Sequence, residues 1–169
     1  MVLAVYPGSF DPFTLGHLDV VRRALRFADE VVVLVAHNAA KQPLLPVGTR
    51  VALIGAAVAD LDGVRVTSSA GLLADQLREL GASVVVKGLR GGADFDAELP
   101  MALMNRHLSG VETAFLVGDP ALAHIASSLV KDVARHGGAI DDLVPPAVAA
   151  AVVAALAAPS RTTTEGSPA

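Results

Sequence analysis

The stretch Val2-Leu-Ala-Val-Tyr-Pro-Gly-Ser-Phe-Asp-Pro-Phe-Thr-Leu-Gly-His17 decides the fold, because it runs from a buried strand through a loop into a helix. Val2 to Tyr6 is a short apolar run that a Pro-Gly pair ends, which is typical of a buried strand. Thr14 has a side chain suited to a helix N-cap, so Gly16 and His17 are expected in the first helical turn. Ligands of open α/β sheets bind at such strand-to-helix junctions.

The same alternation of strand and helix continues along the chain. Apolar runs predict further strands at Glu30–Ala36, Ser83–Val86 and Thr113–Val117, and a weaker pattern predicts one at Val64–Thr67. Apolar residues at helical spacing predict helices at Leu15–Ala28, Val47–Leu61, Leu72–Leu80, Phe95–Leu108, Ser128–His136 and Ala147–Leu156. Near-continuous apolar strands indicate a sheet that is covered on both faces. We therefore expect a single doubly wound α/β domain with a parallel sheet over residues 1–158, followed by a disordered polar tail at 159–169.

Composition excludes several classes of protein. The chain has 169 residues, of which 53% are hydrophobic and 18% charged, and this suits one domain with a substantial core. The absence of cysteine excludes disulfides, cysteine-based zinc sites and cysteine nucleophiles. The net charge of −4 without a basic block argues against a nucleic-acid partner. The apolar run Ala147–Ala158 is shorter than the roughly 20 residues of a membrane span, and the N-terminus reads as a strand, so we expect a cytoplasmic protein without a membrane partner.

The predicted helix Phe95–Leu108 carries two apolar stripes. One consists of Phe95, Leu99, Ala102 and Leu103, and the other of Met101, Met104 and Leu108. One stripe is expected to pack in the core, while the other either packs within the monomer or meets a partner subunit. Pro100 fits best in a first helical turn, so the regular helix is expected to begin near Leu99.

The loop after the first strand has features of a phosphate site. It lacks the Gly-x-Gly-x-x-Gly pattern of dinucleotide-binding folds and the Gly-Lys-Ser/Thr ending of a P-loop. The free amides of the following helix face any phosphate above the sheet. That position should lower the pKa of His17, and a neutral imidazole still donates one hydrogen bond. The alternative is that His17 is merely structural or solvated, as most histidines in a first helical turn are.

Here the residues resemble a known family. Thr14-Leu-Gly-His17 matches the Thr/His-x-Gly-His signature of the nucleotidyltransferase superfamily, and Tyr6–His17 as a whole is similar to bacterial phosphopantetheine adenylyltransferases. Two later segments resemble that family's motifs in the same order, Lys87-Gly-Leu-Arg-Gly-Gly-Ala-Asp-Phe-Asp-Ala-Glu98 with the helix after it, and Ile125-Ala-Ser-Ser-Leu-Val-Lys131. In the second of these, Ser127 and Ser128 are N-cap candidates. The resemblance runs from about Tyr6 to Val144.

The resemblance implies a Rossmann-like nucleotidyltransferase fold and a reaction. The family transfers the adenylyl group of ATP to 4′-phosphopantetheine, which gives dephospho-coenzyme A and pyrophosphate. It also implies Mg²⁺ bound with ATP and a homohexamer. The sequence itself offers no carboxylate cage for the ion, which is consistent with a hydrated ion that the phosphates hold. The residues that match the family's catalytic positions are His17, Lys41 and Arg90. Those that match its substrate-binding positions are Ser9, Lys41, Leu73 and Lys87. The matching ATP-binding positions are Ser9, Phe10, His17, Gly88, Leu89, Arg90, Glu98, Leu122, Ala123, His124, Ile125, Ala126, Ser127 and Ser128.

Two alternatives stay open at this point. One is a related adenylyl- or cytidylyltransferase that acts on another phosphorylated acceptor. The other is a nucleotide-binding sensor that keeps the site without turnover. The chain departs from the family pattern at Ala97, Leu122, His124 and Ala126, which concern the adenine and phosphate subsites. The match over Lys87–Leu108 argues against the first alternative, and the presence of His17, Lys41 and Arg90 argues against the second.

Overall fold

A parallel sheet of five strands organises the chain, whose computed structural model describes residues 1–36 and 42–158. The strands are β1 (Leu3–Gly8), β2 (Glu30–Ala36), β3 (Val64–Ser69), β4 (Val84–Leu89) and β5 (Glu112–Val117). Their order in the sheet is β3-β2-β1-β4-β5, and all neighbouring strands are parallel. The predicted doubly wound parallel sheet is therefore confirmed.

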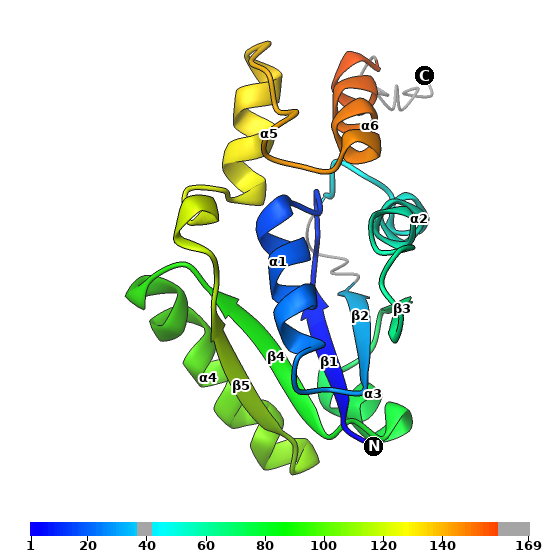
Figure 1. Cartoon of the computed structure of the whole chain (residues 1–169), viewed down its shortest axis with the longest axis vertical. Coiled ribbons are helices and arrows are strands. Elements are labelled where there is room, and N and C mark those ends of the chain that lie inside the picture. The colour runs from blue at the N-terminus through cyan, green and yellow to red at the C-terminus, as the bar shows by residue number, and fades with distance from the viewer. Residues whose placement is uncertain (37–41, 159–169) are drawn as a thin grey trace, which may run out of the picture.

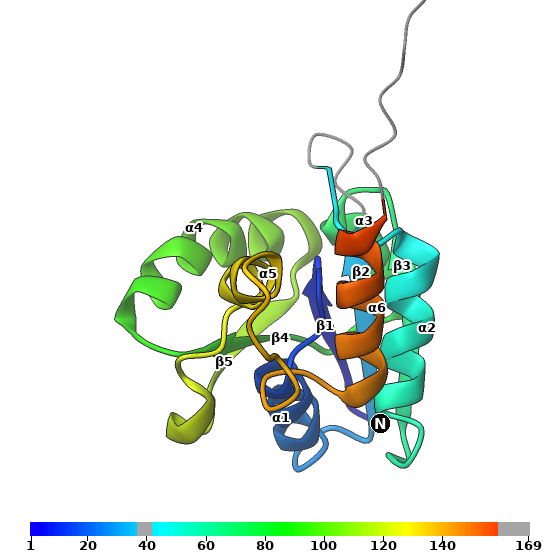
Figure 2. The same ribbon diagram turned by 90° about the horizontal axis from the view of Figure 1, so that it is seen from above.

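Helices cover both faces of the sheet, and two of them lie beyond the carboxyl ends of the strands. They are α1 (Leu15–Ala24), α2 (Val47–Ala57), α3 (Leu73–Leu80), α4 (Gly92–Ser109), α5 (Ser127–Arg135) and α6 (Pro146–Ala157), with a short 3₁₀ turn at Pro120–Leu122. The helices α1 and α2 pack on one face, and α3 and α4 on the other (Figure 1). Figures 1 and 2 show α5 and α6 beyond the carboxyl ends of the strands. None of the helices in the described ranges is long and apolar enough to cross a membrane.

Alternation along the strands explains why both faces are apolar. On β2, Val31, Val33 and Val35 pack with residues of α1 and α2, whereas Val32 and Leu34 pack on the opposite face with α3. Successive side chains of a strand point to opposite faces of the sheet, so a strand that is covered on both sides needs an unbroken apolar run. The continuous valines of the sequence are therefore the direct cause of the layered arrangement.

The structure corrects the predicted boundary between the fourth strand and its helix. β4 continues to Leu89, so Gly88 lies in the strand, which was expected to end at Val86. A Cβ atom on Gly88 would lie 2.5 Å from Cγ2 of Val20, which means that close contact with α1 requires glycine there. The helix α4 begins at Gly92, and Pro100 lies inside it. The expected start near Leu99 was wrong, because the hydrogen bond that Pro100 removes belongs to the carbonyl of Asp96, on an exposed side of the helix.

The first two helices end earlier than their apolar spacing predicts. The helix α1 stops at Ala24 and not at Ala28, and α2 stops at Ala57 and not at Leu61. After α1 the chain continues in a tighter turn, in which the amide of Phe27 donates to the carbonyl of Ala24. Ala28 is nevertheless buried, so its apolar character reflects packing of the turn and not continuation of the helix.

The helix α4 is poorly covered in the monomer. Asn105 is its only buried residue. The first apolar stripe is partly exposed, with Phe95 at 37% and Leu103 at 47%. The second stripe is exposed as well, since Met101 is 55% and Met104 53% accessible. The prediction that one stripe packs in the core was therefore only partly right, because α4 rests on the edge strand β5 and leaves apolar side chains on the surface.

Candidate active site

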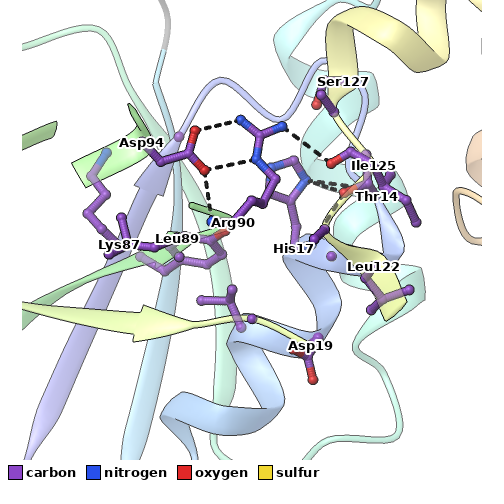
Figure 3. A pocket seen from close by; sticks show the side chains of 18 of the residues that line it. Thr14, His17, Asp19, Lys87, Leu89, Arg90, Asp94, Leu122, Ile125 and Ser127 are labelled. Atoms are coloured by element: carbon purple, nitrogen blue, oxygen red, sulfur yellow. Dashed lines mark hydrogen bonds and ion pairs between the residues drawn. The ribbon is translucent and has the colours of Figure 1, made fainter. Parts of the chain in front are cut away.

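A cavity of about 720 Å³ opens at the carboxyl ends of β1 and β4 (Figure 3). The strand order reverses between these two strands, so the loops that follow them diverge to opposite faces and leave a crevice. Its walls come from the loop after β1, the start of α1, the junction of β4 and α4, and residues 117–128. Most of the residues that the sequence singled out therefore meet at one site.

Thr14 fixes the imidazole of His17. It is the N-cap of α1, as predicted, and its Oγ1 accepts from the amide of His17 at 3.3 Å. In return, the amide of Thr14 donates to Nδ1 of His17 at 3.0 Å, which completes a capping box. A nitrogen that accepts from an amide carries no proton, so the neutral ring has its proton on Nε2. The ring is thus prepared to donate one hydrogen bond from Nε2.

The surroundings of His17 keep it neutral. Its ring stacks on Phe13 with centroids 5.6 Å apart, and the ring of Phe10 meets it edge-on at 5.1 Å. Burial, and to a smaller extent the positive charge of Arg90, lowers the pKa of His17 to about 4. The shift has the expected direction, and its largest cause is burial, here among aromatic rings.

The loop before Thr14 is held in an unusual backbone conformation. Phe10 has a φ of 49°, which is uncommon outside glycine and is often found at functional sites. Its ring lies over Gly8, where a Cβ atom would come within 2.8 Å of Cζ. Glycine at position 8 therefore makes room for the ring of Phe10, and this packing places Ser9 at the cavity wall.

Two ion pairs line the cavity wall between β4 and α4. Nζ of Lys87 lies 3.0 Å from Oε2 of Glu98. Arg90 donates from Nε and Nη2 to the two carboxylate oxygens of Asp94, at 2.9 and 2.8 Å. Hydrogen bonds from Arg90 hold the pKa of Asp94 below its usual value. Burial, together with the Glu98 carboxylate, raises the pKa of Tyr6 above its usual range, so Tyr6 stays protonated at the cavity floor.

The opposite wall is formed by the segment that enters α5. Ala126 is the N-cap of α5, and no side chain caps this helix. Ser127 is its first residue, and its hydroxyl donates to the carbonyl of Pro12 at 2.8 Å. The prediction that Ser127 or Ser128 caps the helix was therefore wrong, because the N-cap position falls one residue earlier. The result is a helix N-terminus with free amides at the cavity wall, which favours an anion.

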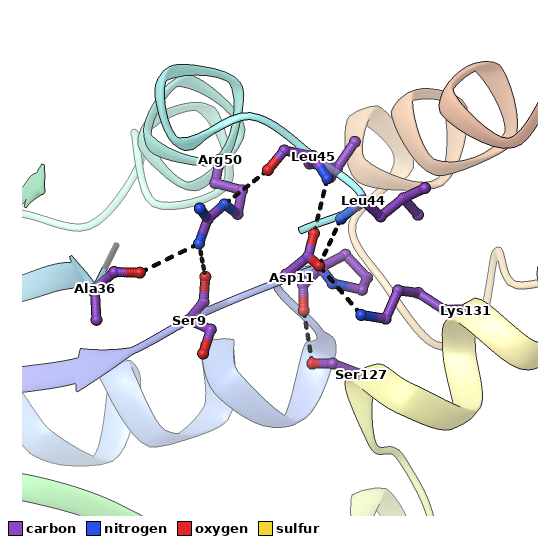
Figure 4. A network of polar contacts seen from close by, with 9 residues as sticks. Ser9, Asp11, Ala36, Leu44, Leu45, Arg50, Ser127 and Lys131 are labelled. Atoms are coloured by element: carbon purple, nitrogen blue, oxygen red, sulfur yellow. Dashed lines mark hydrogen bonds and ion pairs between the residues drawn. The ribbon is translucent and has the colours of Figure 1, made fainter. Parts of the chain in front are cut away.

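A second network braces the same loop from behind (Figure 4). The buried carboxylate of Asp11 accepts from the amides of Leu44 and Leu45, both at 2.9 Å, and from Nζ of Lys131 at 3.1 Å. The buried guanidinium of Arg50 donates to the carbonyls of Ser9, Ala36 and Leu45. These contacts tie the ends of β1 and β2 to α2 and α5, and they border a smaller cavity of about 300 Å³.

Most of the predicted site residues line the larger cavity, whereas His124 and Leu73 do not. Those brought together there are Ser9, Phe10, His17, Lys87, Gly88, Leu89, Arg90, Glu98, Leu122, Ala123, Ile125, Ala126, Ser127 and Ser128. His124 is exposed and is not part of the lining. Leu73 is the first residue of α3 and packs against the core on the face of the sheet that α3 covers. Lys41 lies outside the described residues.

The sequence interpretation missed several acidic residues of the site. Asp19, Asp94 and Asp119 line the cavity, and Asp11 lies behind it. Asp19 accepts from the amide of Asp119 at 2.9 Å, across 100 residues of sequence. A carboxylate on a helix or in a loop is common in any protein, so the residue type at these positions gives no signal. The position of Asp94 four residues after Arg90 was the one available indication.

The site as a whole suits phosphorylated ligands. Two helix N-termini, Arg90 and Lys87 surround a neutral imidazole whose Nε2 carries a proton. Donors fixed in this way stabilise charge that spreads over phosphate oxygens. Among the described residues there is no group of three His, Asp or Glu side chains that could hold a metal ion. The chemistry that this arrangement supports best is transfer of a phosphorylated group.

Comparison with known proteins agrees with the geometry. The family model described as cytidylyltransferase-like matches residues 5–133. The chain is 53% identical over 159 residues to a phosphopantetheine adenylyltransferase from Bifidobacterium longum, covering 93% of this chain and 96% of that protein. It is 56% identical over 154 residues to a phosphopantetheine adenylyltransferase from Clavibacter michiganensis, covering 89% of this chain and 94% of that protein.

A solved structure supports the fold. The chain resembles a crystal structure from Vibrio parahaemolyticus described as a candidate nicotinate-nucleotide adenylyltransferase, with a TM-score of 0.63 and 18% identity, covering 90% of this chain and 99% of that one. At this identity the likeness concerns the fold alone. The predicted Rossmann-like nucleotidyltransferase fold is confirmed.

Proposed function

The chain belongs to the phosphopantetheine adenylyltransferase family, and we propose that it transfers the adenylyl group of ATP to 4′-phosphopantetheine in coenzyme A biosynthesis. The products are dephospho-coenzyme A and pyrophosphate. The observation that carries the assignment to a catalyst, and not merely to a nucleotide binder, is the neutral His17. Its Nδ1 is occupied by Thr14, so its Nε2 proton is available at the cavity between two helix N-termini.

The reaction requires no general base. The acceptor phosphate is already ionised at neutral pH, so one of its oxygens attacks the α-phosphorus of ATP directly. The bond from the α-phosphorus to the oxygen that bridges to the β-phosphate breaks, and its electron pair leaves with pyrophosphate. Catalysis then consists of placing the two phosphates in line and stabilising the charge that develops between them.

Each wall of the cavity has a part in this step. His17 donates from Nε2 to an oxygen of the α-phosphate. Arg90 and the free amides at the start of α5 bind the phosphates of ATP. Ser9 and Lys87 bind on the acceptor side together with Lys41, whose role rests on the family resemblance. Glu98 keeps Lys87 in place at 3.0 Å.

Magnesium enters with ATP in this proposal. The described part of the chain offers no cluster of three carboxylate or imidazole ligands. The site therefore suits a Mg²⁺ ion whose ligands are phosphate oxygens and water molecules. When bound, the ion neutralises charge on the phosphates of ATP. The chain's own residues contribute orientation and hydrogen bonds and not a metal cage.

We also propose a homohexamer in the cytoplasm. The exposed apolar side chains on α4, among them Met101 and Met104, support a subunit interface. The number of subunits rests on the family resemblance.

Product analysis tests the proposed reaction. Incubation with ATP, Mg²⁺ and 4′-phosphopantetheine should give dephospho-coenzyme A and pyrophosphate in equal amounts. Binding of both substrates without either product would instead identify the chain as a sensor. The control is the His17→Ala variant, which should bind ATP but form little product.

A further inference from the structure

Arg90 is held by a neighbour for which the proposed reaction has no role. Oδ2 of Asp94 accepts from the backbone amide of Arg90 at 2.8 Å and from its Nε at 2.9 Å, and Oδ1 accepts from Nη2 at 2.8 Å (Figure 3). Three hydrogen bonds thus join one carboxylate to one residue. Paired contacts of a guanidinium with a carboxylate fix its plane as well as its position.

The contacts leave one edge of the guanidinium for a ligand. The edge formed by Nε and Nη2 is docked on Asp94, and Nη1 lies 3.4 Å from the carbonyl of Ile125 on the opposite wall. Arg90 therefore reaches from the β4–α4 junction across to the segment that enters α5. One N–H on each of Nη1 and Nη2 remains along the outer edge, which is the arrangement that binds two oxygens of a phosphate.

Asp94 is also placed differently from a simple capping residue. Gly91 is the N-cap of α4, so Asp94 occupies the third helical position, from which an acidic side chain ordinarily reaches back to the N-cap amide. Its carboxylate reaches instead to Arg90, the residue before the N-cap. Asp94 is three-quarters buried as a side chain and lines the cavity, while Arg90 remains nearly half exposed.

We propose that Asp94 is a positioning residue that acts on ATP through Arg90. It holds the guanidinium with its outer edge toward the phosphates, so that ATP binds to an arginine that is already oriented. The proposal rests on the proposed function for the identity of the nucleotide. Asp94 does not itself touch the substrate in this proposal, because it acts only through the side chain of Arg90.

The variant Asp94→Asn tests the proposal with little change in shape. An amide in place of the carboxylate sets one N–H group against an N–H of Arg90, so the paired contact is lost. We expect the KM for ATP to rise at least about fivefold, because the loss of a charge-assisted hydrogen bond typically weakens binding by at least this factor. The KM for 4′-phosphopantetheine should change less than about twofold. The matched control is Asp75→Asn, which removes an exposed aspartate–arginine pair on α3 and should leave both KM values unchanged.

A double-mutant cycle separates positioning from a structural role. If Asp94 acts through Arg90, Asp94→Asn should change the KM for ATP less than about twofold in an Arg90→Ala background. An equal change in both backgrounds would overturn the proposal, and so would a parallel rise in the KM of both substrates. Thermal unfolding checks that the variants fold. Asp94→Ser, which keeps an oxygen at the start of α4, replaces the asparagine variant in the same cycle if that variant does not fold.

Failure of this inference is distinguishable from failure of the proposed function. The dissociation constant for ATP is measured by titration without acceptor, so it does not depend on which acceptor the enzyme uses. If another phosphorylated acceptor supports turnover, the proposed function fails. The double-mutant cycle, measured with the dissociation constant for ATP, still tests the role of Asp94. If ATP binds equally well to the parent chain and to Asp94→Asn, the inference fails while the reaction stands.

Discussion

His17 is the residue on which the proposed chemistry depends most. Its replacement by alanine removes the Nε2 donor at a position where charge develops. One such donor is typically worth about 3–4 kcal/mol, so we expect His17→Ala to lower kcat by at least about 100-fold. Initial rates of pyrophosphate release measure the effect. The control His136→Ala removes an exposed imidazole at the C-cap of α5 and should leave kcat unchanged.

The low pKa of His17 also predicts how stability depends on pH. The ring titrates near 6.5 in the unfolded chain but at about 4 in the folded one, so between these values the unfolded state binds the extra proton. The free energy of unfolding should therefore fall as the pH drops from about 6.5 toward 4. Above that range His17 should add nothing to the pH dependence of the free energy of unfolding. Urea unfolding at several pH values measures it. His17→Gln, which cannot titrate but suits a capping box, should lose less stability over this range.

Equal acid dependence in the parent chain and in His17→Gln would contradict this account of His17. The sequence predicted that Thr14 caps the first helix and that His17 lies in its first turn, and the structure confirms both. The sequence was insufficient for Asp11 and Arg50, since nothing in their local pattern distinguishes a buried partner from a solvated charge. The roles of these two residues depend on contacts between segments that only the fold brings together. For Asp94, only its position four residues after Arg90 indicated a partner.

At the level of elements, Gly88 joins the site to the packing of the sheet. A Cβ atom there would lie 2.5 Å from Cγ2 of Val20 on α1, so Gly88→Ala must displace that helix or the strand. We expect a loss of about 1–3 kcal/mol in the free energy of unfolding, which is typical of overpacking. Chemical denaturation of the variant measures it. The matched control is Gly92→Ala, where a Cβ atom meets nothing within 4 Å.

A compensating change makes the test of Gly88 sharper. Val20→Ala removes the methyl groups that a Cβ on residue 88 would meet. The double variant should therefore lose less stability than the sum of the two single variants. Additive losses would show that the contact between β4 and α1 does not explain the glycine.

The existence of the elements was easier to predict than their limits. The partly exposed edge strand β3 (Val64–Ser69) has only a weak apolar pattern. Apolar runs predicted the other four strands, because strands covered on both faces are mostly apolar. They failed at the end of β4, where Lys87 and Gly88 interrupt the apolar pattern but the strand continues to serve the site. They also failed at Pro100, because a proline on an exposed side of a helix costs a hydrogen bond without ending the helix.

At the scale of the whole molecule, α4 predicts assembly. Its exposed Met101, Met104 and Leu103 form an apolar surface that a monomer leaves in water. We expect Met104→Glu to lower the molar mass measured by light scattering at micromolar concentration, because an interface does not tolerate an unpaired charge. The control Val153→Glu alters an equally exposed apolar residue on α6 and should leave the mass unchanged. A parent chain that is already monomeric would contradict the proposed hexamer.

The layered arrangement of the whole molecule followed from sequence, while the closure of its site did not. Alternating strands and helices of this kind allow few topologies once crossovers are right-handed. The strand reversal between β1 and β4 then places the crevice. The way in which residues 117–128 fold over that crevice depends on long-range contacts such as that between Asp19 and the amide of Asp119. No local pattern of the sequence contains that information.

The central claim is that the site transfers adenylyl groups to 4′-phosphopantetheine, and the acceptor dependence of pyrophosphate release tests it most directly. The purified chain is supplied with ATP and Mg²⁺, and the rate is compared with 4′-phosphopantetheine, nicotinate mononucleotide and glycerol 3-phosphate as acceptors. The account predicts that release requires an acceptor and is fastest with 4′-phosphopantetheine. Faster turnover with either of the other acceptors, or no release with any of them, would contradict it.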